Sequence, residues 1–168
     1  HGKFRRQRQM CIRDRTSTDA PVMLLAAGAL KVALATTHLP LSAVPDAITP
    51  DGLERSLRVL ASGLRSSFNI SRPRITVLGL NPHAGENGYM GSEELEVIGP
   101  VCDLLRAEGL RIKGPISADT AFSAAQRATT DAYLAMFHDQ GLPIIKSERF
   151  GEIVNVTLGL PMIRTSVD

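Results

Sequence analysis

Apolar runs of strand length alternate with segments of helical period along most of this chain, and this alternation constrains the fold more than any other feature. The strand-like runs lie at residues 22–26, 30–35, 74–80, 132–137 and 153–160, and a further short strand is expected near Ile112. Strands and helices that alternate in this way form a mostly parallel sheet with helices on both faces. We therefore predict an α/β fold with α/β/α layers, built around a core of aliphatic side chains because aromatic residues make up only 4% of the chain.

Two helices have recognisable starting signals. Residues 49–51, Thr-Pro-Asp, offer a cap, a proline for the first turn and an early acid, and leucines then share one face at positions 53, 57, 60 and 64. A second helix is expected after Ser92, with Glu93 and Glu94 favouring its positive end. Pro100 lies within this second pattern and predicts a kink.

Basic residues are unevenly distributed. Six of the 19 lysines and arginines lie within residues 1–15, and the remainder of the chain carries 13 basic and 16 acidic residues. The body of the chain is therefore mildly acidic and gives no reason to expect a nucleic-acid surface. The basic stretch either contacts phosphate backbones or is foreign to the fold, and its lack of hydrophobic period favours the second interpretation. We treat residues 1–15 as a non-native basic extension and residues 16–168 as the α/β/α segment.

The sequence lacks three kinds of signal, and each absence argues against one class of protein or site. No apolar run approaches the ~18 residues that a membrane-spanning helix requires. The two cysteines, Cys11 and Cys102, are far apart and form no CxxC pair, which argues against a disulfide framework or a thiolate zinc site and fits a cytoplasmic protein. No GxGxxG occurs, so the sequence does not indicate a Rossmann dinucleotide site.

Three histidines, His38, His83 and His138, each follow directly on a predicted strand. Ligands of open α/β sheets bind beyond the carboxyl ends of the strands, so the three imidazoles can meet at one edge. Three imidazoles with an open position are typical of a catalytic divalent-metal site. The alternative is three unrelated histidines that cap strands or bind loop carbonyls, and the spacing alone does not separate the two.

The surroundings of these histidines favour a shared site. The sequence THLPLSAVPDAIT contains His38, GLNPHAGENGYMGSEE contains His83, and FHDQGLPIIK contains His138; GPISADTAF and VNVTLGLPMIRTSVD complete the set. In this order, the motifs resemble those of the 4-hydroxythreonine-4-phosphate dehydrogenase family. The resemblance implies a fold similar to that of isocitrate and isopropylmalate dehydrogenases, with an active site in the cleft at a homodimer interface.

The resemblance also implies roles for individual residues. His38, His83 and His138 would bind a divalent metal such as zinc, cobalt or magnesium, with His138 contributed to the site of the partner subunit. Lys146, Asn155 and Arg164 match the substrate-contacting positions of the family; without the family, each is an ordinary solvated residue. The implied reaction is the NAD- or NADP-dependent oxidation and decarboxylation of 4-phosphohydroxy-L-threonine to 3-amino-2-oxopropyl phosphate, in vitamin B6 (pyridoxal phosphate) biosynthesis.

Two aspartates near the inferred site are further candidates. Asp119 in SADT and Asp139 in HDQG are placed to orient an imidazole or relay a proton. The alternative is helix capping by Asp119 and a turn hydrogen bond by Asp139. The sequence assigns no residue to the nicotinamide cofactor.

The chain departs from the family pattern in two ways. A His-Thr pair that contacts substrate in the family is missing before TDAPVM, where this chain reads CIRDRTSTDAP. The usual N-terminal portion and C-terminal helices are also missing, so we expect a central, incomplete part of the fold that is inactive alone.

Other functions remain open at this stage. A related dehydrogenase of phosphorylated threonate or erythronate would keep the metal and phosphate groups but would not meet a substrate amine. A three-histidine zinc hydrolase would turn over without any nucleotide. A nucleic-acid-binding module led by the basic stretch ranks last, and predicts salt-dependent binding that disappears without residues 1–15.

Overall fold

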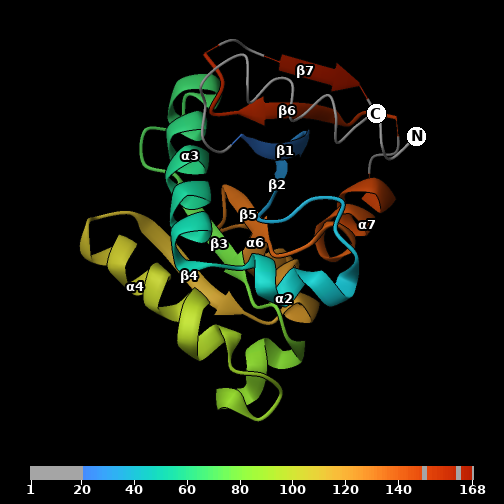
Figure 1. Cartoon of the computed structure of the whole chain (residues 1–168). Coiled ribbons are helices and arrows are strands. Elements are labelled where there is room, and N and C mark those ends of the chain that lie inside the picture. The colour runs from blue at the N-terminus through green and yellow to red at the C-terminus, as the bar shows by residue number, and fades with distance from the viewer. Residues whose placement is uncertain (1–20, 149–150, 162–163, 168) are drawn as a thin grey trace.

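The computed structural model describes residues 21–148, 151–161 and 164–167. These residues form one seven-stranded sheet of order β4-β3-β5-β2-β1-β6-β7 (Figure 1). The strands are β1 (Val22–Ala27), β2 (Leu30–Leu34), β3 (Arg74–Leu78), β4 (Arg111–Ile116), β5 (Ala132–Ala135), β6 (Val154–Leu158) and β7 (Arg164–Val167). The predicted strands are all present, and β7 is an addition that the sequence analysis missed. The basic stretch at residues 1–15 lies outside the described residues.

The sheet is mixed but mostly parallel in direction. Strands β4, β3, β5 and β2 run parallel to one another. Strand β1 is antiparallel to both β2 and β6, so β6 runs with the parallel set, while β7 opposes it. The carboxyl ends of β2, β3 and β5, which are adjacent in the sheet, therefore lie along one edge.

Helices cover both faces, which confirms the predicted α/β/α layering. One face carries α3 (Pro50–Phe68) and α4 (Gly99–Ala107), and the other carries α7 (His138–Glu148) with the short helices α5 (Ala118–Ala121) and α6 (Ala124–Arg127). The predicted cap of α3 is present, since the Thr49 side chain accepts a hydrogen bond from the backbone N–H of Gly52 at 3.2 Å. The four leucines of its apolar face are at most 2% exposed. None of the helices that the structure describes is long and apolar enough to cross a membrane.

The helix predicted after Ser92 changes geometry along its length. A π-helical turn, η3 (Glu94–Ile98), precedes α4, and the backbone N–H of Gly99 donates to the carbonyl of Glu94. Pro100 lies in the first turn of α4. Because proline has no N–H to continue the hydrogen-bond ladder, the interruption predicted at Pro100 is a change from π to α geometry.

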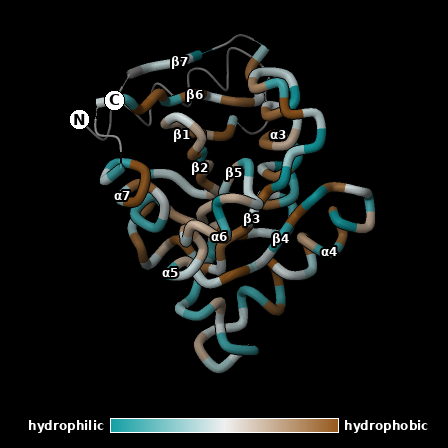
Figure 2. Tube along the Cα trace, turned by 180° about the vertical axis from the view of Figure 1, so that it is seen from behind, coloured by the Kyte–Doolittle hydropathy of each residue, from teal (hydrophilic) through white to brown (hydrophobic). Residues whose placement is uncertain are grey.

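Three shorter elements lie next to the carboxyl edge of the sheet. They are η1 (Leu41–Ala43), α2 (Val44–Ala47) and η2 (Pro82–Gly88). Figure 2 shows that the segment at the narrow end of the molecule, around η2, is mostly hydrophilic. This segment therefore differs in composition from β3 and β5, whose side chains are largely buried.

Candidate active site

The three histidines lie beyond the carboxyl ends of adjacent parallel strands. His38 follows β2, His138 begins α7 directly after β5, and His83 lies in η2 after β3. Parallel strands end at the same edge, so the topology brings the three segments together although 100 residues separate the first and the last.

His38 and His138 are neighbours. Their ring centroids are 5.4 Å apart, with the ring planes inclined by 44°. The buried Thr36 links their two strands, since its hydroxyl donates to the carbonyl of Met136 at 2.7 Å. Nδ1 of His138 lies 2.6 Å from a carboxylate oxygen of Asp139, so this aspartate contacts one of the paired imidazoles.

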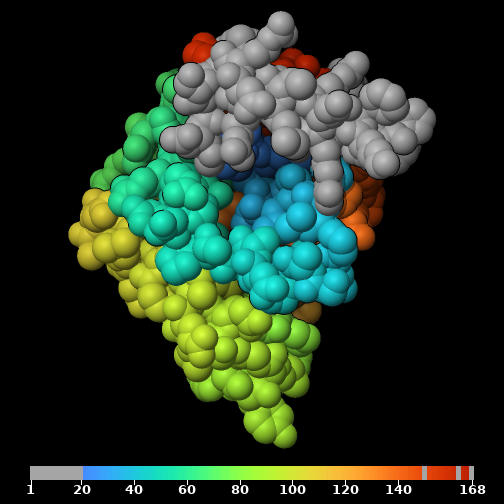
Figure 3. Space-filling model, in the orientation of Figure 1, coloured from blue at the N-terminus to red at the C-terminus, as the bar shows by residue number. Residues whose placement is uncertain are grey.

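His83 lies apart from this pair, on a turn of unusual backbone geometry. Residues 83–87 all have positive φ, between 43° and 79°. The exposed imidazole of His83 lies 2.7 Å from Glu86 through Nδ1. This hydrogen bond, together with the negative charges of Glu86 and Asp119, raises the pKa of His83 above its ordinary value. Figure 3 shows this segment at the narrow end of the molecule.

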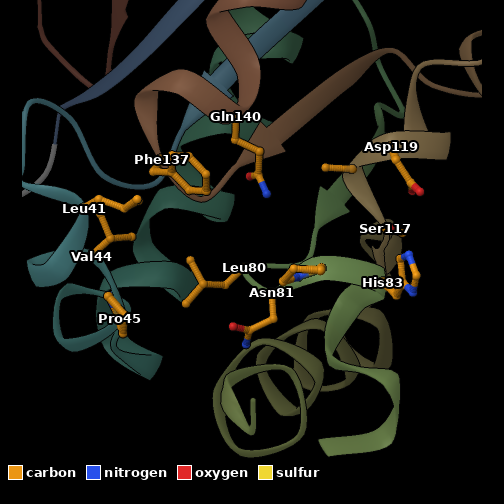
Figure 4. A pocket seen from close by; sticks show the side chains of 12 residues that line it. Leu41, Val44, Pro45, Leu80, Asn81, His83, Ser117, Asp119, Phe137 and Gln140 are labelled. Atoms are coloured by element: carbon orange, nitrogen blue, oxygen red, sulfur yellow. The ribbon is translucent and has the colours of Figure 1, made fainter. Parts of the chain in front are cut away.

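A cavity of about 600 Å³ lies next to His83 (Figure 4). Its volume is in the range of small-molecule sites. One side is apolar, formed by Leu41, Val44, Pro45, Leu80 and Phe137, and polar groups line the rest, namely Asn81, His83, Ser117, Asp119 and Gln140. A ligand here would meet an apolar wall and a small set of hydrogen-bonding groups.

Asp119 shares this cavity with His83. A hydrogen bond from Ser117 is the main cause that lowers the pKa of Asp119, and the charge of His83 adds to it. The carboxylate is therefore ionised at neutral pH and can accept a proton or a hydrogen bond. Asp139 is not among the residues that line the cavity.

The three expected substrate-contacting residues lie in another part of the molecule. Lys146 is on α7, Asn155 on β6 and Arg164 on β7. Asn155 pairs in register with Leu25 on one side and Ser166 on the other. None of the three lines the cavity beside His83. Within one chain, the anion-binding candidates are thus on the half of the sheet away from that histidine.

The described residues of one chain do not by themselves form a complete metal site. Within the described parts of the chain, no group of three or more His, Cys, Asp or Glu side chains is placed to hold a metal ion. The residue types suit a divalent ion, because imidazoles are its commonest ligands near neutral pH. The arrangement supplies one close pair, His38 and His138, and one separate imidazole, His83.

Polar residues missed by the sequence analysis hold these segments. Glu94, interpreted there as an acid that favours the positive end of a helix, is only 5% exposed, and its carboxylate accepts a hydrogen bond from the backbone N–H of Asn81 at 2.7 Å. The Gln140 amide contacts the ends of both β3 and β5. Both residues lie in the quoted motifs, and a long polar motif after a strand is the signal that could have identified them.

Comparisons with known proteins identify relatives of this chain. The profile of the family described as pyridoxal phosphate biosynthetic protein PdxA matches residues 4–168, and so extends into the basic stretch. The 4-hydroxythreonine-4-phosphate dehydrogenase of Thioalkalivibrio sulfidiphilus is 63% identical over 155 residues, which cover 92% of this chain and 47% of the relative. That of Aromatoleum aromaticum is 58% identical, with 92% and 48% covered. The chain spans about half the length of the curated relatives it matches.

Solved structures give the same result. The 4-hydroxythreonine-4-phosphate dehydrogenase of Klebsiella pneumoniae superimposes with a TM-score of 0.87 at 39% identity, over 95% of this chain and 48% of that one. A terephthalate 1,2-cis-dihydrodiol dehydrogenase from Burkholderia xenovorans gives 0.78 at 28% identity, over 85% and 45%. The fold is the isocitrate/isopropylmalate dehydrogenase-like one of these enzymes. From the profile match and the identities together, the chain belongs to the family of the pyridoxal phosphate biosynthetic protein PdxA.

Proposed function

We propose that the protein containing this chain oxidises 4-phosphohydroxy-L-threonine with NAD or NADP and a divalent metal, and decarboxylates the product to 3-amino-2-oxopropyl phosphate. The observation that carries the proposal is the placement of His38, His83 and His138 beyond three adjacent parallel strands, with a cavity of ligand size beside His83. Membership of the PdxA family supplies the reaction.

The three histidines are the proposed metal ligands. Bound there, a divalent ion would act as a Lewis acid that favours loss of the alcohol proton and stabilises negative charge during decarboxylation. Asp139 contacts His138 at 2.6 Å and would fix the orientation of that imidazole. The protein's own task is to hold the imidazoles in the correct orientation.

Asp119 is proposed to orient an imidazole or to relay a proton. It lines the same cavity as His83, and its lowered pKa keeps the carboxylate ionised, so that it can accept hydrogen bonds there. In the first step, the substrate alcohol loses its proton to a base and its hydride to the nicotinamide ring, which is reduced. The resulting β-keto acid then loses its carboxylate as carbon dioxide, and the electron pair left on carbon takes up a proton.

Lys146, Asn155 and Arg164 are the proposed substrate-binding residues. Lysine and arginine suit the phosphate and the carboxylate of the substrate, and asparagine can bind its polar groups. Lys146 lies on α7, the helix that begins at His138, and Asn155 and Arg164 lie on β6 and β7 in the same half of the molecule. None of the three lines the cavity beside His83.

That separation supports a homodimer with shared active sites. One copy would supply His83, Asp119 and the cavity, and the second copy would supply the half that carries His138 and the anion-binding residues. Exposed apolar side chains near the cavity and η2, Leu41 at 69% and Tyr89 at 87%, offer surface for such a contact. A second copy would complete the set of three metal ligands that one chain lacks.

The test uses the full-length parent protein with 4-phosphohydroxy-L-threonine, NAD and a divalent metal, and follows the absorbance of reduced nicotinamide. Unmodified protein should turn over only with metal, and both His83→Ala and Arg164→Ala should lose most of that turnover. Arg111→Ala, an exposed arginine at the start of β4, is the matched control and should behave as the unmodified protein.

The outcomes separate the rival functions. No nicotinamide reduction by a folded, metal-loaded dimer would contradict the proposed substrate, and turnover of 4-phosphoerythronate instead would favour the threonate and erythronate enzymes. Metal-dependent hydrolysis in the absence of any nucleotide would favour the three-histidine hydrolase.

A further inference from the structure

The buried carboxylate of Glu94 holds the segment that precedes His83. It accepts hydrogen bonds from the backbone N–H of Asn81 at 2.7 Å and from the side-chain amide of Asn81 at 2.9 Å. The same amide also donates to Glu93 at 2.6 Å. Among the described residues, Glu94 has no ion pair with a lysine, arginine or histidine. Burial of an acid without a cation is costly, so its hydrogen bonds to this loop must compensate.

Glycines make room for this arrangement. A Cβ added at Gly79 would lie 2.9 Å from one carboxylate oxygen of Glu94, and one added at Gly85 would lie 2.7 Å from the other. A Cβ at Gly91 would overlap the side chain of Asn81. Three glycines of the motif are therefore explained by the packing of the Asn81–Glu94 pair.

The segment that Glu94 holds is a turn whose backbone conformation is unfavourable for most of its residues. His83, Ala84, Glu86 and Asn87 have Cβ atoms and yet adopt positive φ. For each such residue this backbone is less favourable than the right-handed conformation. Contacts outside the turn must supply the compensation, and the Glu94 carboxylate at its base is positioned to do so.

Gln140 connects the same segment to the next strand. Its amide N–H donates to the carbonyl of Gly79 at 2.6 Å, beyond the end of β3, and its oxygen accepts from the backbone N–H of Met136 at 2.7 Å, at the end of β5. The regular pairing of β3 with β5 ends at Val77 and Leu134. Gln140 thus continues the connection between the two strands past the sheet, and Figure 4 shows its side chain at the cavity.

We infer that Glu94 and Gln140 are positioning residues of the active site: Glu94 fixes the left-handed turn that presents His83, and Gln140 fixes that turn relative to the end of β5. The inference rests on the proposed function, because it gives the two residues a role only through the histidines that would bind metal. It also explains why Glu94 and Gln140 are present in these motifs, although neither takes part in the proposed reaction.

The substitutions Glu94→Gln and Gln140→Met test this role with little change in side-chain size. A glutamine at 94 has one acceptor oxygen where two N–H groups of Asn81 now bind, and its own NH₂ would face the amide of Asn81. A methionine at 140 can bind neither Gly79 nor Met136. The matched controls are Glu96→Gln, an exposed acid on the same helical turn, and Gln126→Met on α6.

Two measurements are made on the full-length parent protein. Amide hydrogen exchange reports the order of residues 79–91, and titration with Co²⁺, followed by its absorption spectrum, reports metal affinity. We expect faster exchange in this segment for Glu94→Gln, with β2 unchanged, and a ten- to hundredfold weaker Co²⁺ affinity for both test variants. The two controls should match the unmodified protein in both measurements.

A double substitution separates positioning from general destabilisation. In a His83→Ala background, Glu94→Gln should weaken Co²⁺ binding no further, because the residue it positions is gone. An equal loss in both backgrounds, or unchanged exchange and affinity in the single variants, would overturn the inference and leave the proposed function standing. Failure of the unmodified dimer to bind Co²⁺ at all would overturn both.

Discussion

The central strands and the loops at their carboxyl ends are stabilised in different ways. In β2, β3 and β5, side chains such as Val32, Val77 and Leu134 are completely buried and contact other aliphatic groups. A few residues further along the chain, His38 and His83 have left-handed backbones. The segment of His83 is held by specific hydrogen bonds, which Glu94 accepts from Asn81 and Gln140 donates to Gly79.

This difference predicts which property of the protein, stability or ligand affinity, each kind of substitution will change. Aliphatic burial is nondirectional and contributes roughly in proportion to area, so the strands should govern global stability. Hydrogen bonds at the loops fix direction, so they should govern ligand affinity with smaller effects on stability. The following predictions test that division.

Leu134→Ala should have the largest effect on stability. Leu134 is fully buried in the central strand β5, and a cavity there should cost about 2–5 kcal/mol of unfolding free energy. Denaturant unfolding measures the loss, and the folded fraction should retain its metal affinity. Leu104→Ala on α4, where the side chain is 48% exposed, is the control and should lie within about 0.5 kcal/mol of the unmodified protein. Equal losses for both would contradict the proposed division.

Gly85→Ala should lower the free energy of unfolding by less than Leu134→Ala does, but it should also weaken metal binding. Gly85 has a φ of 79° and packs against Glu94, so alanine there adds a steric conflict to an unfavourable backbone, about 2–3 kcal/mol in total. At Gly109, φ is 93° but no atom lies within 4 Å of the added Cβ, so Gly109→Ala should cost only about 1 kcal/mol. Metal affinity should fall for Gly85→Ala alone. If the two variants were indistinguishable, the close packing of Glu94 would have no energetic role.

Asp131→Asn tests a polar contact at the opposite end of the sheet. The Asp131 carboxylate binds the guanidinium of Arg74 at 2.7 Å and accepts from its backbone N–H, and these bonds lower its pKa below the ordinary value. The partly exposed pair should contribute about 1–2 kcal/mol. Because the folded-state pKa is lowered, this contribution is complete above the ordinary aspartate pKa and is lost as the pH falls through the folded value. Unfolding at neutral and strongly acidic pH measures it, and the difference between unmodified and substituted protein should shrink only at the acidic end.

Glu86→Gln should have the smallest effect on the fold. Its exposed carboxylate is the main cause of the raised pKa of His83. Removing that charge should return the pKa toward the ordinary histidine value, with no measurable change in unfolding. A titration of the His83 imidazole by NMR gives the result directly. A pKa that stays raised would mean that Asp119, the other acid near His83, has the larger influence.

Much of the architecture follows from the sequence alone. The apolar runs identified the strands, the leucines after Thr49 identified the buried face of α3, and the position of each histidine after a strand placed all three at one edge. These features are readable because burial depends on local periodicity and because parallel strands end together. The motifs also identified the family, which the profile match confirms.

Only the tertiary structure decided how the site is arranged. It places His38 beside His138, sets His83 apart in a left-handed turn, and separates Lys146, Asn155 and Arg164 from the cavity. It also buries Glu94, which the sequence alone presents as an ordinary acid at a helix start. Such features depend on contacts between segments far apart in the chain, and the identity of a polar residue does not reveal which distant N–H group its side chain will bind.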